Sequence, residues 1–109
     1  MGKPSLACKP GLAYRGRVAD VYDALAAPAR RAILDVLTVR DDQSLFEITT
    51  RLLGDHGISL TRQAVSQHLA VLEEAGLVSS RRQGRTRLHT LDTRPLRAIA
   101  RRWPDKESS

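Results

Sequence analysis

Four polar side chains fall on one side of the segment that begins at Thr61, if that segment is helical. They are Arg62, Gln63, Ser66 and Gln67. Arginine can donate hydrogen bonds to guanine, glutamine can pair with adenine, and serine can address either base. The acidic residues of this segment, Glu73 and Glu74, lie at its far end, where they would not repel phosphate beside the N-terminal turns. The pattern is typical of a helix whose N-terminal turns enter a DNA groove.

A basic stretch follows this segment almost at once. It contains four arginines around one glycine, in the order Arg81-Arg82-Gln83-Gly84-Arg85-Thr86-Arg87. We expect a hairpin with a basic tip that holds phosphates while the helix contacts bases.

The helix that carries the four polar residues has a start, a buried side and an end in the sequence. Thr61 is a suitable N-cap, because its hydroxyl can accept a backbone N–H of the first turn. Val65, Leu69 and Leu72 follow at i, i+4 and i+7 and predict a buried stripe. Gly76 suits the left-handed position after the last turn, with the next leucine folding back onto the helix. The periodicity alone is equally consistent with an ordinary amphipathic helix, and the basic hairpin favours DNA.

Three further helices are predicted before this one. The first covers residues 17–26, the second runs from Pro28 to a polar turn at 40–43, and the third ends at Gly54, before a link at 55–59. Ser44 and Glu47 have the spacing of a capping box and start the third helix. The apolar positions of the three helices are Val18, Val21, Tyr22, Leu25, then Ile33, Leu34, Val36, Leu37, then Leu45, Ile48, Leu52 and Leu53.

After Gly76 the apolar spacing changes from that of a helix to that of strands. Two short strands are predicted at residues 78–82 and 86–91, around a tip at 83–85, and a final helix begins near Pro95. The apolar stripe of this helix is Leu96, Ile99, Ala100 and Trp103. The predicted fold class is mainly α with a small β-hairpin, a winged helix-turn-helix of order α-α-α-α-β-β-α.

The length of 109 residues is enough for one domain with a modest core. We expect that domain at residues 16–104, between a flexible leader at 1–15 and a polar tail at 105–109. The net charge is +6, and residues 61–103 alone hold nine arginines and three acidic residues. A basic surplus confined to the part that holds the polar helix and the hairpin is typical of a protein that binds a polyanion.

The sequence has no run that approaches the length of about 18 apolar residues that a membrane helix needs, and no apolar region of a signal peptide. We therefore expect no membrane partner and, by default, a cytoplasmic protein. Cys8 is the single cysteine, so no internal disulfide can form. Its place in the leader favours an incidental thiol over a redox role.

The sequence offers no set of residues for catalysis or for metal binding. No nucleophile–base–acid set and no glycine-rich phosphate loop occurs, and Ser66 and His68 point to different sides of one helix. Soft metal ions need several converging thiolates or imidazoles, whereas Cys8, His56 and His89 are far apart in the sequence. We expect His56 in a loop, His89 in a strand and His68 packed or facing phosphate. The prediction is no enzyme, no cofactor and no tight metal site.

Three segments resemble the ArsR-type family of bacterial winged helix-turn-helix repressors. Residues 24–34, ALAAPARRAIL, are similar to the start of the second helix in that family. Residues 64–78, AVSQHLAVLEEAGLV, resemble its recognition helix and the beginning of its wing, and residues 82–85, RQGR, resemble the wing tip. The similarity covers roughly residues 18–103 in the expected order, which is more specific than any single motif.

This resemblance implies a homodimer, built from the first and last helices, that binds double-stranded DNA at a palindromic operator. It also implies repression of transcription and release by an inducer. At the matching positions, the residues at or near the bases are Thr61, Arg62, Gln63, Ser66 and Gln67. The wing contacts, mostly to phosphate or the minor groove, are Arg82, Gly84, Arg85 and Arg87. The expected dimer interface contains Val21, Leu96, Ile99, Ala100 and Trp103.

The chain departs from the family pattern in three places. Ala27 replaces the usual Asp, Ser or Asn N-cap, the link at 55–59 is longer than the usual tight turn, and both familiar metal sites lack their ligands. The last departure predicts a member that does not sense metal and leaves its signal unidentified. The alternative interpretation is a winged-helix module for architectural DNA binding or for protein–protein contact. A module of the latter kind would expose apolar residues on its wing, where this chain has arginines.

Overall fold

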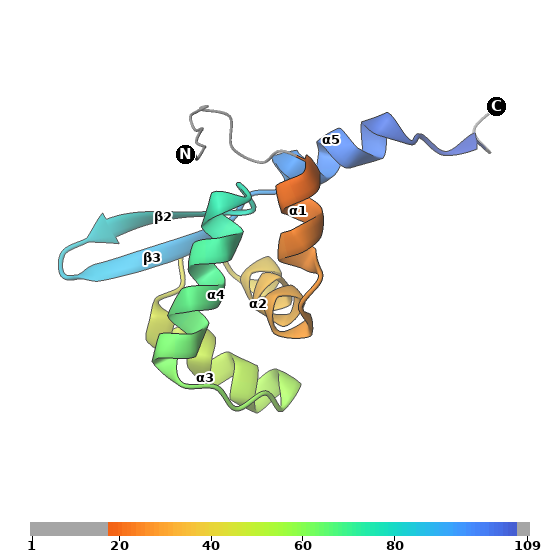
Figure 1. Ribbon diagram of the computed structural model, residues 1–109. Helices are drawn as coiled ribbons and strands as arrows, with labels where there is room; N and C mark the ends of the chain where they lie inside the picture. The colour runs from red at the N-terminus through yellow and green to blue at the C-terminus, as the bar shows by residue number, and fades with distance from the viewer. Residues whose placement is uncertain (1–17, 107–109) are drawn as a thin grey trace, which may run out of the picture.

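The structure, a computed structural model, describes residues 18–106 and shows helices packed beside a two-stranded hairpin (Figure 1). The elements are α1 (Val18–Leu25), α2 (Pro28–Val39), α3 (Leu45–His56), α4 (Arg62–Glu74), β2 (Val78–Gln83), β3 (Thr86–Leu91) and α5 (Arg94–Arg102). This order confirms the predicted winged helix-turn-helix: α3 and α4 are its two helices and the hairpin is its wing.

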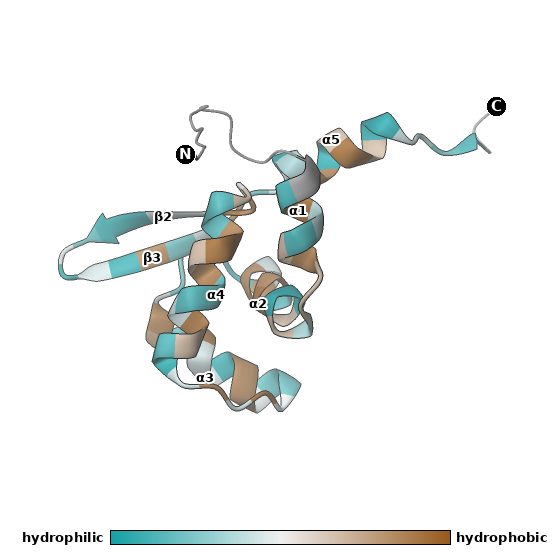
Figure 2. Ribbon diagram, in the orientation of Figure 1, coloured by the Kyte–Doolittle hydropathy of each residue, from teal (hydrophilic) through white to brown (hydrophobic). Residues whose placement is uncertain are grey.

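The core is aliphatic and lies between α1, α2, α3 and α4. Leu77 and Val78, where the wing begins, belong to this core, and Leu96 and Ile99 of α5 are partly buried against it. In Figure 2 the wing is mostly hydrophilic, whereas hydrophobic segments recur on the four core helices. The buried apolar residues are Val21, Ala24, Ala32, Ile33, Leu34, Val36, Leu37, Ile48, Leu52, Val65, Leu69, Leu72, Ala75, Leu77 and Val78.

Both ends of α4 are fixed by the local chemistry that the sequence predicts. The Thr61 hydroxyl accepts the backbone N–H of Ala64 at 3.0 Å, which confirms the N-cap. Gly76 has a φ of 80°, and the N–H of Leu77 donates to the carbonyl of Leu72 at 2.9 Å. This is the Schellman ending, so the length of α4 is set within its own sequence.

The predicted end of α3 at Gly54 is wrong. The helix continues to His56, and the left-handed residue that ends it is Gly57, with a φ of 66°. The N–H of Ile58 then donates to the carbonyl of Leu52 at 2.9 Å. A glycine inside a helix costs only about 1 kcal/mol relative to alanine, so Gly54 alone does not stop it. His56 therefore lies in the last turn of α3 rather than in a loop, and the link to α4 begins later than expected.

The wing is an antiparallel hairpin whose pairs run from Val78 opposite Leu91 to Gln83 opposite Thr86. Because this last pair is formed, the loop has two residues rather than the predicted three. Its first residue, Gly84, has a φ of 64°, which a side chain at that position would disfavour.

Candidate nucleic-acid interface

The outer face of α4 carries the four predicted base-contacting side chains. All four are exposed and make no hydrogen bond or ion pair within residues 18–106: Arg62, Gln63, Ser66 and Gln67. The opposite side of the helix is buried through Val65, Leu69 and Leu72. The polar groups of this face are therefore available to an external partner. Thr61 is also exposed, but its hydroxyl already accepts the N-cap hydrogen bond.

The wing concentrates positive charge that its own structure leaves largely uncompensated. Arg82 lies directly opposite Arg87 in the hairpin, a pairing of like charges that destabilises the strands. Arg87 donates a hydrogen bond to the hydroxyl of Ser80 at 3.1 Å. In the described part of the chain, the side chains of Arg82 and Arg85 make no hydrogen bond or ion pair. A phosphate group placed against this surface would offset the repulsion.

A groove of about 600 Å³ separates α4 from the wing. Cations and a hydroxyl line it at Arg85, Arg87 and Ser66, and an acid and an imidazole line it at Glu73 and His89. The arrangement gives a polyanionic chain cationic and hydroxyl donors between the base-facing helix and the wing. The remaining lining residues are Ser44, Leu45, Phe46, Leu69, Ala70 and Thr86.

His89 is a buried residue of β3 whose side chain faces Glu73 of α4. Its side chain is 6% exposed, and its Nδ1 lies 3.7 Å from a carboxylate oxygen of Glu73 without a hydrogen-bond partner among the described residues. Burial lowers the pKa of His89 below its usual range, the Glu73 carboxylate partly opposes that effect, and Arg87 adds to it. The imidazole is therefore neutral at neutral pH.

This burial predicts a loss of stability in mild acid. In the unfolded chain His89 takes up a proton near its ordinary pKa of about 6.5, whereas the folded protein resists it. The unfolded state then binds more protons, so the free energy of unfolding falls as the pH decreases, by at most about 1.4 kcal/mol per pH unit for one group. We expect urea unfolding between about pH 7.5 and about pH 5.5 to show this slope. The slope should be smaller in a His89→Gln variant, and parallel curves for the two proteins would contradict the assignment.

The helices α1 and α5 lie on the side away from the wing (Figure 1). An aromatic pair joins α1 to the residue that follows the last turn of α5. The rings of Tyr22 and Trp103 stack at 6.4 Å between centroids, and the guanidinium of Arg102 lies 4.7 Å from the Trp103 ring centroid. The two aromatic residues remain 45% and 57% exposed. Their exposed rings form an apolar surface that a second molecule could cover.

The expected dimer-interface residues divide between core and surface. Val21 is 0% exposed in the single chain, so it packs in the core of its own protomer rather than, as predicted, against a partner. The next residue, Tyr22, points outward instead, because helical neighbours face different sides. Leu96 and Ile99 are partly buried, and Ala100 and Trp103 are exposed. The sequence placed Tyr22 on the apolar side of this helix but did not single it out for the interface.

Within residues 18–106, no group of three or more His, Cys, Asp or Glu side chains is placed to hold a metal ion. His68 accepts a hydrogen bond at 3.3 Å from Arg30, whose guanidinium also donates to two carbonyls at the end of α1. Cys8, like the rest of the expected leader, lies outside the described residues. No helix of the described chain is long and apolar enough to span a bilayer.

An exposed polar recognition helix beside a basic wing defines the class of winged helix-turn-helix DNA-binding proteins. Comparisons with known proteins agree. The family model described as "Helix-turn-helix domain" matches residues 25–81. The uncharacterized HTH-type transcriptional regulator YuzN of Bacillus subtilis is 42% identical over 83 residues, which cover 76% of this chain and 90% of that protein. The transcriptional repressor SdpR of Bacillus subtilis is 30% identical over 74 residues, covering 68% and 74% respectively.

Solved structures give the same assignment. An ArsR-like transcriptional regulator from Rhodococcus sp. RHA1 is 33% identical, with a TM-score of 0.68 over 78% of this chain and 72% of that one. A homodimeric winged helix-turn-helix DNA-binding domain from Mycobacterium bovis, a possible ArsR-family regulator, is 30% identical, with a TM-score of 0.61 over 76% and 71%. The chain belongs to the ArsR-type helix-turn-helix transcriptional regulators. It is a DNA-binding regulator and not an enzyme.

Proposed function

We propose that this regulator is a homodimeric repressor that binds a palindromic operator in double-stranded DNA and leaves it in response to a signal. In this proposal α4 contacts bases in the major groove, the wing holds phosphates or the minor groove, and the protein acts in the cytoplasm, where its DNA lies. The name of the relative SdpR supports repression, and the homodimeric domain from Mycobacterium bovis supports the dimer.

The observation that carries the proposal is that α4 and the wing expose different kinds of polar side chain. The helix α4 exposes side chains that can form hydrogen bonds with the edges of nucleobases, namely Arg62, Gln63, Ser66 and Gln67. The wing instead exposes arginines, which suit phosphate, and it has no apolar tip of the kind that protein contact would favour. This division supports sequence-specific binding over architectural binding.

The direct test is a gel-shift measurement with DNA from upstream of the protein's own gene. A complex that survives an excess of nonspecific competitor DNA is the expected result. Equal affinity for the upstream DNA and for the competitor would instead favour the architectural or protein-contact module. A footprint of the same DNA would then give the spacing of the half-sites.

Arg85→Ala is expected to weaken binding to operator and random DNA to a similar extent. If Arg85 contacts phosphate, its loss releases about one counterion fewer on binding, so the log–log salt slope becomes shallower by about one unit. Titrations at several salt concentrations measure the slope. Arg101→Ala is the control, because Arg101 is an exposed arginine on α5, which lies on the opposite side of the molecule from the wing (Figure 1). A loss of affinity for the operator alone would contradict a phosphate role for Arg85.

Trp103→Ala is expected to weaken the dimer. In the proposed dimer α5 packs against α1 and against its symmetry mate, which would cover the exposed Tyr22–Trp103 pair. Tryptophans at the centre of an interface commonly contribute about 2 kcal/mol or more, and the substitution removes one from each protomer, so the dissociation constant of the dimer should rise roughly thirtyfold or more. Sedimentation equilibrium over a concentration series measures this change. If the variant associates as the unsubstituted protein does, Trp103 lies outside the interface.

A further inference from the structure

The orientation of the wing relative to the helices depends on contacts outside its two strands. An isolated two-stranded hairpin is at best marginally stable in water, so it does not hold an orientation by itself. At its base, Val78 is buried and Leu91 is partly buried against the core. Further out, β3 forms an isolated antiparallel bridge with the loop between α2 and α3. In this bridge the N–H of Gln43 donates to the carbonyl of His89 at 3.1 Å, and the N–H of His89 donates back at 2.8 Å.

Asp42, beside this bridge, contacts both strands of the wing through one carboxylate. Its Oδ1 accepts a hydrogen bond from the Thr90 hydroxyl at 2.8 Å, and its Oδ2 accepts one from the Arg81 guanidinium at 3.0 Å. These two bonds hold the pKa of the Asp42 carboxyl below its usual range. Asp42 also has a φ of 57°, and it is the one residue other than glycine with a positive φ in the described chain. The loop thus adopts a disfavoured backbone conformation at the residue that reaches the wing.

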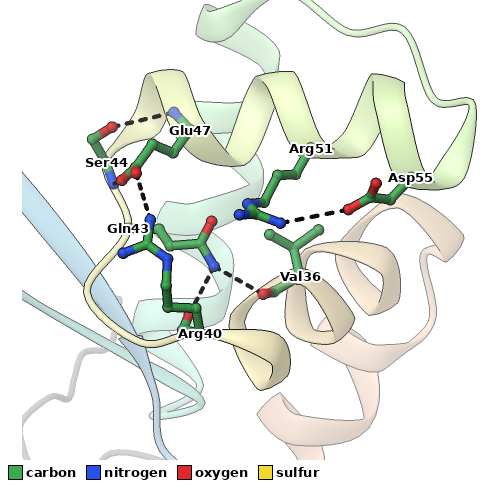
Figure 3. A network of polar contacts seen from close by, with 7 residues as sticks. All are labelled: Val36, Arg40, Gln43, Ser44, Glu47, Arg51 and Asp55. Carbon is green, nitrogen blue, oxygen red and sulfur yellow. Dashed lines mark hydrogen bonds and ion pairs between the residues drawn. The ribbon is translucent and has the colours of Figure 1, made fainter.

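The loop that carries Asp42 is itself anchored between two core helices (Figure 3). The side-chain amide of Gln43 donates to the carbonyls of Val36 at 2.9 Å and Arg40 at 2.7 Å. Arg40 forms an ion pair with Glu47, whose carboxylate also accepts the N–H of Ser44 in the capping box of α3. Asp42 therefore lies in a loop that is held to α2 and α3, and its contacts with Thr90 and Arg81 hold the wing to the same loop.

We propose that Asp42 is a positioning residue for DNA binding, which sets the angle of the wing relative to α4 by holding Thr90 of β3 and Arg81 of β2. The inference rests on the proposed DNA-binding function, because its effect is exerted through the wing arginines. The effect that it predicts for the loss of Asp42 is opposite in sign to the effect that charge alone would have on DNA affinity. Removal of a negative charge near the wing would by itself tighten DNA binding, whereas loss of the wing's orientation weakens it.

The test is Asp42→Gly, since glycine accepts the left-handed backbone and removes both carboxylate contacts. We expect the affinity for the operator to fall about tenfold, with a shallower salt slope, as for the loss of one or two phosphate contacts. In a chain that already carries Arg82→Ala, Arg85→Ala and Arg87→Ala, Asp42→Gly should cause no further loss, because the arginine contacts that it orients are absent. Asp42→Asn keeps an acceptor oxygen for Thr90 and should restore part of the affinity.

Asp41→Asn is the matched control, since it removes a charge from the adjacent exposed residue and should leave binding unchanged or slightly tighter. Thr90→Val removes one of the same bonds from the strand side, and it carries the test if the glycine variant does not fold. Affinity equal to or above that of the unsubstituted protein would overturn the positioning role, as would an undiminished loss in the variant that lacks the DNA-contacting wing arginines. If the unsubstituted protein itself binds no operator in this assay, the proposed function fails instead.

Discussion

Leu72→Ala is expected to lower the free energy of unfolding by about 2–5 kcal/mol. Leu72 is 0% exposed and lies on the buried side of α4 with Val65 and Leu69. The truncation removes buried methyl groups and leaves a cavity that the surrounding helices fill only in part. Because a small domain has only about 5–15 kcal/mol of stability, the loss should shift the midpoint of urea unfolding strongly.

Leu53→Ala is the matched control for this prediction. It is the same chemical change on the neighbouring helix α3, but Leu53 is 58% exposed. We expect a loss within about 0.5 kcal/mol, as for other surface substitutions. If the two variants lose the same stability, α4 is not held to the core by the face that the structure assigns to it, and its outer residues are not those proposed for DNA.

The sequence predicted α4 well because its ends depend on residues inside or next to it. The hydroxyl of Thr61 and the left-handed Gly76 act within one turn, so no distant contact is needed to recognise them. The exposure of Gln63 and Ser66 follows from the same periodicity, since it is the complement of the buried stripe. The candidate base-contacting surface could thus be identified before the fold was known.

The errors concern residues whose role is decided by other elements. Gly54 and Gly57 are equally plausible helix ends by residue type, and only one takes the left-handed conformation. Leu53 and Val21 have apolar side chains at helical spacing, yet one is exposed and the other is fully buried. Local periodicity gives the phase of a helix but not how wide a stripe its neighbours cover.

The support of the wing could not be predicted for a similar reason. Asp42 and Thr90 are 48 residues apart, and the polar turn that contains Asp42 has the composition of an ordinary loop. Nothing in its local pattern indicates a bridge between Gln43 and His89. Such contacts exist only once α2, α3 and the hairpin have packed. The residue types of the candidate DNA-binding surface can therefore be read from local sequence, whereas the orientation of its wing depends on residues far apart in the chain.

Gln63→Ala is expected to reduce affinity for the operator by about 1–3 kcal/mol, or roughly 5- to 150-fold, and to leave binding to random DNA almost unchanged. Gln63 is exposed in the first turn of α4, next to the N-cap, and its side chain makes no hydrogen bond or ion pair within the described residues. Its amide can donate and accept at once, which is the pattern that adenine presents in the major groove. Since the glutamine carries no charge, its loss should not alter the salt slope.

The contact can be assigned to a base pair by titrating the protein and the variant against operators substituted at single positions. At the position that Gln63 contacts, substitution of the DNA should cost the protein the full effect and the Gln63→Ala variant almost none, because the interaction is already lost. Gln83→Ala is the control, since Gln83 is an exposed glutamine in the wing whose amide oxygen already accepts a hydrogen bond from Arg81 at 3.1 Å. A loss that is the same on operator and random DNA, or that is spread evenly over all positions, would place Gln63 on the backbone and assign base recognition to other residues of α4.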